Sequence, residues 1–318
     1  MSKSISIVIP SFNEAENIGE LYSRIVATLK KINISDYEII YIENGSTDKS
    51  LEILKNLNNK DKSVKIISFS RNFGLQSAIY AGLTEAEKNY VCVLDGDLQD
   101  PPELIEDFFN KIDKGFDIVY GIRKKRITNF FKNYCYKLFY FFFSNFSEVH
   151  MPSQVGEFCL IKKNICEIIV NFKEKNLFIR GLRSWAGFKQ TGIEYERPER
   201  NAGKEKFNFL SSFFLGLDGI ISFSIFPLRL ILLFGIIISF FSILFIIFIF
   251  IVKLLSIFQL VGSDSLFLMP KGLTITNILF LFMGSFIILA LGIIGEYIAK
   301  IYYESKNRPH FIIKEKIK

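Results

Sequence analysis

The sequence is poor in the residues that form zinc sites and disulfide frameworks. It has two histidines and four cysteines, and no two of the cysteines form a CxxC pair. A zinc site is therefore not expected, and unpaired thiols fit a reducing cytosol. No GxGxxG motif follows the first predicted strand, and neither GxxxxGKS nor GxxxxGKT occurs. These absences argue against a dinucleotide cofactor and against a P-loop nucleotidase.

Acidic residues are the minority among the charged residues. Lys and Arg number 39 against 32 for Asp and Glu, which gives a net charge of +7. Half of the residues are hydrophobic, and the chain after residue 207 consists mostly of Phe, Ile, Leu and Ser. In a chain with long apolar runs, an excess of positive charge favours anionic lipids or phosphate substrates as partners. The sequence has no base-reading motif, so nucleic acid is not an expected partner.

Short apolar strands alternate with amphipathic helices in the first two thirds of the chain. This alternation predicts an α/β fold with a mostly parallel sheet and right-handed crossovers. The predicted strands are residues 5–10, 37–42, 64–70, 91–94, 117–120, 156–162 and 188–197.

Polar side chains recur where the predicted strands end. They include Asn13 and Glu14, Glu43 and Asn44, Arg71, Asp95 and Asp97, and Arg123. Because the carboxyl ends of parallel strands share one edge of the sheet, we expect these segments to converge on one crevice. The sequence therefore predicts a nucleotide-binding site at this edge.

The run Asp95-Gly96-Asp97 is the most informative of these strand ends. It follows the apolar run Val91–Leu94, and Pro101-Pro102 then opens the next helix. Two nearby carboxylates form an oxygen site suited to Mg²⁺ or Mn²⁺, which complete their coordination with substrate phosphates. An isolated Asp-x-Asp is more often a polar turn, so the metal hypothesis depends on the rest of the chain.

Two segments have the composition of helices at a membrane interface. Residues 127–147 follow the basic cluster Arg123-Lys124-Lys125-Arg126 and are rich in Phe and Tyr, with lysines interleaved. Residues 207–226 are amphipathic and are expected to lie along the bilayer. For the first segment, the alternative is a core helix with a charged rim.

Residues 230–252 and 273–295 are two long uncharged runs. Each contains 23 residues, which at 1.5 Å per residue is roughly 35 Å of helix and enough to cross a bilayer. The segment between them has few basic residues, whereas six follow Ala299. By the positive-inside rule, both termini and the α/β domain are expected in the cytoplasm, with two spans in the cytoplasmic membrane.

Together these motifs resemble the polyisoprenyl-phosphate glycosyltransferases of glycosyltransferase family two, which include dolichol-phosphate mannose synthases and bacterial enzymes that load a sugar onto undecaprenyl phosphate. The resemblance covers nearly the whole chain and implies a GT-A, Rossmann-like fold. The matching segments are 8–14, 44–48, 71–74, 95–103, 120–123, 180–182, 222–224 and 227–229.

The resemblance implies a role for each matched residue on the donor side. The base and ribose would be lined by Pro10, Phe12, Glu14 and Asn44. Asp95 and Asp97 would lie at the diphosphate, and Asp97 and Gln99 would bind Mg²⁺ or Mn²⁺. Arg200 and Lys206 would close over the donor diphosphate.

On the acceptor side, Arg123 would face the lipid phosphate with help from Lys132, and Glu157 occupies the position of a catalytic Asp. The sequence departs from the family pattern here and elsewhere. Glu43-Asn44 replaces Asp-Asp, Cys159 replaces an Arg, and Glu205 replaces a Ser. A lipid phosphate is already mostly ionised near pH 7 and needs positioning more than a general base, so Glu157 is an acceptable replacement.

The expected organisation is a cytoplasmic GT-A domain over residues 1–206, a juxtamembrane segment over 207–226, a two-helix membrane domain over 227–301 and a basic tail over 302–318. The expected function is an inverting transfer of sugar from a nucleoside-diphosphate sugar, with UDP as the expected nucleotide, to a polyprenyl phosphate such as undecaprenyl phosphate. The resemblance also makes a homotetramer plausible. Two alternatives stay open: a family-two transferase with another acceptor, and a nucleotide-sugar-binding scaffold without activity.

Overall fold

The computed structural model describes residues 3–124, 155–172, 174–175, 177–196, 226–257 and 273–318. The chain divides into two compact units, one formed by Met1–Phe223 together with Asn307–Lys318 and the other by Ser224–Lys306. The predicted interfacial segments 127–147 and 207–226, except Phe226, lie outside the described residues.

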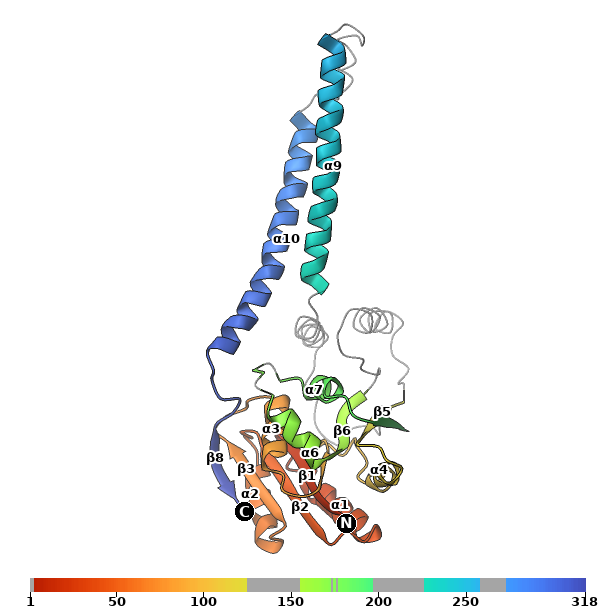
Figure 1. Cartoon of the computed structure of the whole chain (residues 1–318). Coiled ribbons are helices and arrows are strands. Elements are labelled where there is room, and N and C mark those ends of the chain that lie inside the picture. Colours follow the sequence, from red (N-terminus) through yellow and green to blue (C-terminus); the bar gives the residue numbers. More distant parts are fainter. Residues whose placement is uncertain (1–2, 125–154, 173, 176, 197–225, 258–272) are drawn as a thin grey trace. The chain divides into compact units, whose positions relative to one another are not determined.

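The first unit is an α/β domain built around one eight-stranded sheet (Figure 1). Its strands are β1 (Ser4–Ser11), β2 (Asp36–Glu43), β3 (Val64–Phe69), β4 (Tyr90–Val93), β5 (Ile118–Arg123), β6 (Val155–Lys162), β7 (Gln190–Tyr195) and β8 (Ile313–Ile317). Its described helices are α1 (Ile18–Lys31), α2 (Ser50–Lys60), α3 (Leu75–Glu85), α4 (Leu104–Asp113), α6 (Lys163–Val170) and α7 (Ile179–Trp185).

The strand order is β7-β5-β6-β4-β1-β2-β3-β8. Parallel pairing joins β1 to β2 and β4, β2 to β3, and β5 to β7. The predicted α/β fold with a mostly parallel sheet is therefore confirmed, and each of the seven predicted strands overlaps a strand of the structure.

Strand β6 runs against both of its neighbours. It pairs antiparallel with β4 on one side and with β5 on the other, so that Cys159 is opposite both Val93 and Tyr120. Because β6 is reversed, its first residues lie at the edge where β4 and β5 end. This reversal brings Gly156 and Glu157 to the predicted site, although they begin a strand.

Two apolar layers cover the two faces of the sheet. Helices α1, α2 and α4 pack their buried Ile, Leu and Phe side chains on one face. Helices α3, α6 and α7 pack on the other. The amphipathic pattern of α1 shows why: Ile18, Leu21, Ile25 and Leu29 recur at helical spacing and are all buried. The sheet is thus fixed from both sides, and its strand-end loops are held by a rigid core.

The predicted basic tail contains a strand that the sequence analysis did not predict. Strand β8 pairs antiparallel with β3 at the edge of the sheet. Just before it, Phe311 stacks on Phe69 with ring centroids 4.9 Å apart, and Ser70 N–H donates to the Ile312 carbonyl at 3.0 Å. The end of the chain is therefore part of the α/β domain.

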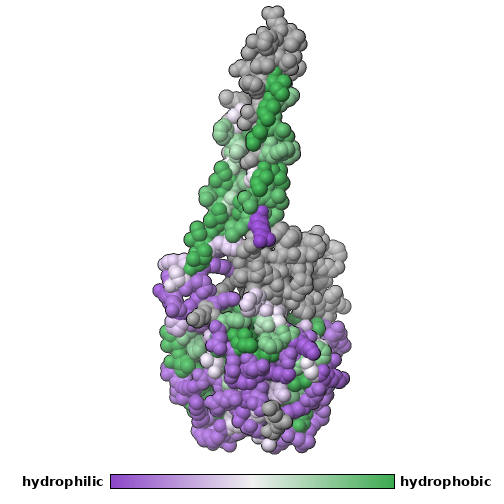
Figure 2. All heavy atoms as spheres, viewed as in Figure 1, coloured by the Kyte–Doolittle hydropathy of each residue, from purple (hydrophilic) through white to green (hydrophobic). Residues whose placement is uncertain are grey.

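The second unit contains helices α9 (Phe226–Ile257) and α10 (Leu273–Ser305), which include the two predicted spans. Large apolar side chains such as Phe240, Phe280 and Ile288 are exposed on them. The green surface in Figure 2 shows the hydrophobic character of this unit. Within the described residues, one stretch is long and apolar enough to cross a membrane, Phe282–Ser305, and none of its most apolar window is buried. That the first predicted run also crosses a membrane stays a prediction.

Candidate active site

The loop after β4 brings the predicted nucleotide and diphosphate residues together. Leu94 N–H donates to the Val8 carbonyl at 3.0 Å, which fixes this loop beside the end of β1. A Cβ added at Gly96 would lie 3.1 Å from the Pro10 carbonyl oxygen and 3.8 Å from Glu14 Cγ. Glycine therefore allows the Asp95–Asp97 turn to approach the β1 loop closely.

Asp97 and Gln99 are buried in a tight turn. Their exposed fractions are 7% and 8%, and Gln99 N–H donates to Asp97 Oδ1 at 3.2 Å. Leu98 between them has a φ of 62°, a conformation that non-glycine residues adopt rarely. Two oxygen-bearing side chains in one turn fit Mg²⁺ or Mn²⁺, which need few protein ligands when a diphosphate supplies others. The described residues hold no group of three or more His, Cys, Asp or Glu side chains that could bind a metal by themselves.

The loops after β1 and β2 are joined by hydrogen bonds. Asn13, with a φ of 54°, accepts from Thr47 N–H at 2.8 Å through its amide oxygen, and its own N–H donates to Ser46 Oγ at 3.0 Å. Glu14 N–H donates to Ser50 Oγ at 3.0 Å, and Asn17 donates to the Glu14 carboxylate at 2.6 Å. Two of the predicted strand ends thus form one rigid structure.

The side chain of Asn44, which replaces a family Asp, holds a loop. It is buried, its Oδ1 accepts from Phe73 N–H at 2.9 Å, and its Nδ2 donates to the Gly74 carbonyl at 3.2 Å. An amide can donate and accept at once, which a carboxylate cannot. Asn44 therefore shapes the predicted nucleotide site through residues 72–74.

The carboxylate of Glu43 is also used within the protein. It accepts from Ser46 N–H and, at 2.6 Å, from Ser68 Oγ, and the residue is buried. Both residues that replace the family's Asp-Asp, Glu43 and Asn44, are thus hydrogen-bonded to segments around the site.

Arg123 lies between two acidic side chains. Its Nη2 is 3.3 Å from Asp95 Oδ2 and 3.8 Å from Asp100 Oδ1, and its Nε donates to Tyr195 Oη at 3.3 Å. Burial alone would lower the pKa of Arg123, but the carboxylates of Asp100 and Asp95 outweigh it and raise the pKa. The guanidinium is therefore a permanent positive charge beside the Asp95 turn.

Glu157 is held by residues from two helices. Gln76 Nε2, on α3, donates to Glu157 Oε1 at 2.9 Å, and Arg180 Nε, on α7, lies 3.6 Å from the same oxygen. Gln76 is itself fixed because its Oε1 accepts from Ile179 N–H at 2.8 Å. The sequence pointed to Glu157 but not to Gln76, whose role depends on packing between α3 and α7.

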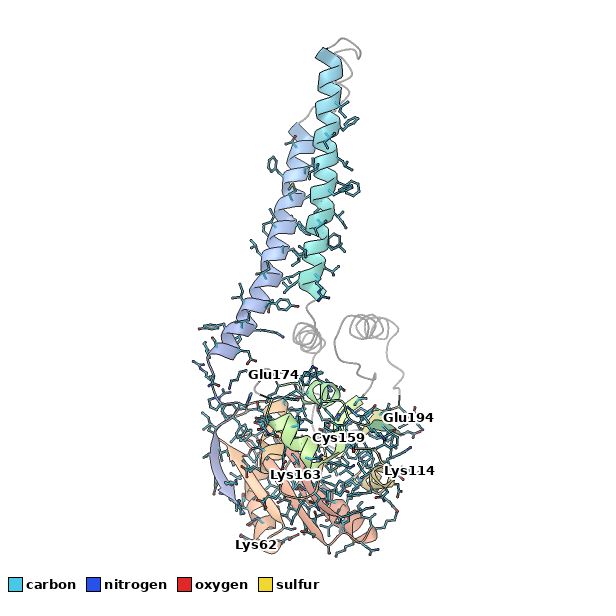
Figure 3. The ribbon with its side chains drawn as sticks, in the orientation of Figure 1. Lys62, Lys114, Cys159, Lys163, Glu174 and Glu194 are labelled. Carbon is cyan, nitrogen blue, oxygen red and sulfur yellow. The ribbon has the colours of Figure 1, made fainter. Side chains whose placement is uncertain are left out.

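Cys159, the other departure from the family pattern, lies inside the domain on β6 (Figure 3). Burial raises the pKa of its thiol, and the neighbouring Arg183 guanidinium offsets part of that rise. Arg183 is itself almost fully buried and lies over the Tyr120 ring. A guanidinium from α7 thus lies beside the position where the family has an Arg, and the neutral thiol is not suited to be a nucleophile.

The structure unites most of the predicted site. The turn that contains Asp95, Asp97 and Gln99 lies beside Pro10, Glu14 and Arg123. The predicted residues Lys132, Arg200 and Lys206 lie outside the described residues. Sequence reasoning missed Asp100 and Tyr195, which both contact Arg123. Asp100 belongs to the matched 95–103 segment, and that was its only signal.

Comparison with known proteins identifies the family of the chain. The profile of Glycosyl transferase family 2 matches residues 6–169. An uncharacterized glycosyltransferase, YkcC of Bacillus subtilis, is 41% identical and the match covers 99% of this chain and 95% of that protein. The bactoprenol glucosyl transferase of Shigella phage SfV is 36% identical, with 98% of each chain covered. An uncharacterized glycosyltransferase of Synechocystis, sll0501, is 34% identical over 99% of this chain and 96% of its own.

The chain belongs to glycosyl transferase family 2. It is a glycosyltransferase, and the resemblance read from its motifs is confirmed.

We predict that Gly156→Ala lowers sugar transfer without unfolding the domain. The new Cβ would lie 2.7 Å from Arg123 Nη2. The guanidinium must therefore move, and a displacement of about 1 Å in a reacting site can cost about 100-fold in rate. The displaced atoms are the end of a flexible side chain, so the melting temperature should change little.

Gly19→Ala is the matched control, because a Cβ at that helical position meets no atom within 4 Å. It should leave the rate of transfer unchanged. Full activity of Gly156→Ala, measured with purified protein, would contradict the close packing of the Arg123 guanidinium on Gly156 that we describe.

Proposed function

We propose that this protein transfers a sugar from a nucleoside-diphosphate sugar, with UDP as the expected nucleotide, to a polyprenyl phosphate such as undecaprenyl phosphate. The observation that carries this proposal is the juxtaposition of a permanent cation, Arg123, with the Asp95–Asp97 turn. One site then has a place for the donor diphosphate and, beside it, a place for an anionic acceptor. The bactoprenol glucosyl transferases of three Shigella phages, each 34–36% identical over nearly the whole chain, support a lipid-linked acceptor.

The donor half of the proposal uses the loops after β1, β2 and β4. Pro10, Phe12 and Glu14 contact the nucleotide, with Asn44 fixing the neighbouring loop. Asp95 orients the donor, and Arg200 and Lys206 add positive charge over the diphosphate. A divalent cation held by Asp97 and Gln99 would neutralise charge on the leaving nucleoside diphosphate.

The acceptor half uses Arg123 and Lys132 to place the lipid phosphate. An oxygen of this phosphate attacks the anomeric carbon as the bond from that carbon to the diphosphate oxygen breaks. The products are the glycosyl-phosphate lipid, with inverted configuration, and the nucleoside diphosphate. Because the attacking oxygen is already ionised, no strong base is required. Glu157, fixed by Gln76 and Arg180, contributes orientation and the local charge balance.

The membrane arrangement in this proposal has two spans. Strand β8 pairs with β3 inside the α/β domain, so the chain on both sides of the Ser224–Lys306 unit belongs to one domain. Any path through a bilayer between them must cross it an even number of times. Phe282–Ser305 is one candidate span, and α9, which precedes it in the chain, supplies the other crossing in this proposal. The basic residues at the end of the chain favour a cytoplasmic domain.

The homotetramer that the resemblance implies stays a prediction. The scaffold alternative rested on Glu43, Asn44, Glu157 and Cys159. Each of these side chains has a hydrogen-bonded or charged neighbour within the domain, and the transfer assay below decides between activity and the scaffold.

Asp97→Ala is expected to lower transfer by at least about 100-fold, because the site would no longer hold the divalent cation whose positive charge would neutralise the leaving diphosphate. The assay follows labelled sugar from a panel of UDP- and GDP-sugars to undecaprenyl phosphate. Asp113→Ala, which removes only a surface partner of Lys3, is the control. Unchanged activity of Asp97→Ala would refute the metal assignment, and a wild type that transfers nothing would favour the scaffold.

Topology has a separate test in whole cells. Tags placed after Lys318 and between Val261 and Ser265 should lie on opposite sides of the membrane, because α9 and α10 each cross it once in our proposal. Accessibility of the two tags to an impermeant reagent is the measurement. Labelling of both tags from the same side would contradict the two-span arrangement.

A further inference from the structure

Recognition of a phosphate by arginine depends on how well the guanidinium is held. Arg123 ends β5, with a long side chain that has many rotamers when it is unconstrained. Fixing such a side chain costs conformational entropy on binding, unless the folded protein already holds the side chain in place. The neighbours of Arg123 should therefore decide how tightly an acceptor phosphate binds.

Asp100 is the first of these neighbours. Its exposed fraction is 0%, and its Oδ1 lies 3.8 Å from Arg123 Nη2. Its Oδ2 is buried and has no hydrogen-bond partner. A buried carboxylate with an incomplete set of hydrogen bonds is costly unless a cation compensates it, and the Arg123 guanidinium supplies that positive charge.

Tyr195 is the second neighbour and connects the other two residues. Strand β7 is in register with β5, so that Tyr195 is directly opposite Arg123. The Tyr195 hydroxyl donates to Asp100 Oδ1 and accepts from Arg123 Nε at 3.3 Å. Burial, followed by the charge of Asp100, raises the pKa of Tyr195, so the hydroxyl keeps the proton that it donates.

The ring of Tyr195 is itself held in place. It contacts the Phe158 ring edge to face, with centroids 5.9 Å apart. A Cβ at Gly121 would lie only 2.6 Å from Tyr195 Cε1, so the ring packs directly on the backbone of β5. The hydroxyl position is therefore fixed by packing as well as by hydrogen bonds.

The two carboxylates that flank Arg123 differ in a way that separates their roles. The Asp95 side chain is 17% exposed and belongs to the turn assigned to the donor, whereas the Asp100 side chain is fully buried. A donor can therefore reach Asp95 but not Asp100. If Asp95 turns toward the donor, Asp100 and Tyr195 still hold Arg123 from the protein side.

We propose that Asp100 and Tyr195 are positioning residues that fix the Arg123 guanidinium for the acceptor phosphate, independently of the donor. The role of Arg123 toward the acceptor rests on the proposed function. The holding of Arg123 by Asp100 and Tyr195 does not, and it is tested separately.

Tyr195→Phe keeps the ring and removes the hydroxyl. We expect the KM for undecaprenyl phosphate to rise about tenfold, the equivalent of about 1.4 kcal/mol, while the donor KM stays within twofold of wild type. The melting temperature should fall by a few degrees, because the buried Asp100 carboxylate loses a hydrogen bond. In an Arg123→Lys background the same change should add less than twofold, because the residue acts through Arg123.

Tyr22→Phe is the matched control. Tyr22 also donates to an aspartate, Asp61 Oδ2 at 2.7 Å, from a helix that contributes no residue to the site. It should leave both KM values unchanged. If Tyr195→Phe leaves the acceptor KM unchanged, or raises the donor KM as much as the acceptor KM, the positioning role is wrong.

A second readout needs no substrate. In full-length protein labelled with ¹⁵N-arginine, the Arg123 Nε–H signal should exchange slowly with solvent in wild type and at least tenfold faster in Tyr195→Phe. Fast exchange in wild type would overturn the proposal. Slow exchange in a wild type that does not use a polyprenyl phosphate would refute the proposed function alone.

Discussion

The reversed direction of β6 is the constraint on which the rest of the site depends. Because β6 is inserted antiparallel between β4 and β5, its first residues meet the ends of its two neighbours. Gly156 then lies against the Arg123 guanidinium, and Glu157 comes within reach of helices α3 and α7. A parallel β6 would put these residues at the far edge of the sheet, and Arg123 would lose its contact with Gly156.

The charges around Arg123 are arranged so that its guanidinium keeps a counter-ion while substrates bind and leave. Arg123 has a buried counter-ion in Asp100 and a more accessible one in Asp95. The side chains of Asn13, Glu43 and Asn44 hydrogen-bond the neighbouring strand-end segments to one another. These loops therefore need to move little when a substrate binds. Such preorganisation is how a protein stabilises charge that shifts during a reaction at low reorganisation cost.

Much of the fold could be predicted because it is encoded locally. The strands are short apolar runs and α1 has a regular amphipathic period, so both could be found from the sequence alone. The direction of β6 could not, because it depends on long-range pairing with β4 and β5. Strand β8 was missed because Ile313–Ile317 has three consecutive charged residues between its two Ile and is mostly exposed, a pattern that also fits a solvated tail. The Asp100–Tyr195 contact joins residues far apart in the chain, and no spacing reveals it.

The structure of the product tests the central claim most directly. The enzyme should be given an α-linked, ¹³C-labelled UDP-sugar from the donor screen and undecaprenyl phosphate, and the lipid product examined by ¹³C and ³¹P NMR. The account predicts one new bond from the anomeric carbon to the lipid phosphate oxygen, with β configuration. A product with retained α configuration, or with the sugar on anything other than the lipid phosphate, would contradict direct attack by a phosphate held at Arg123.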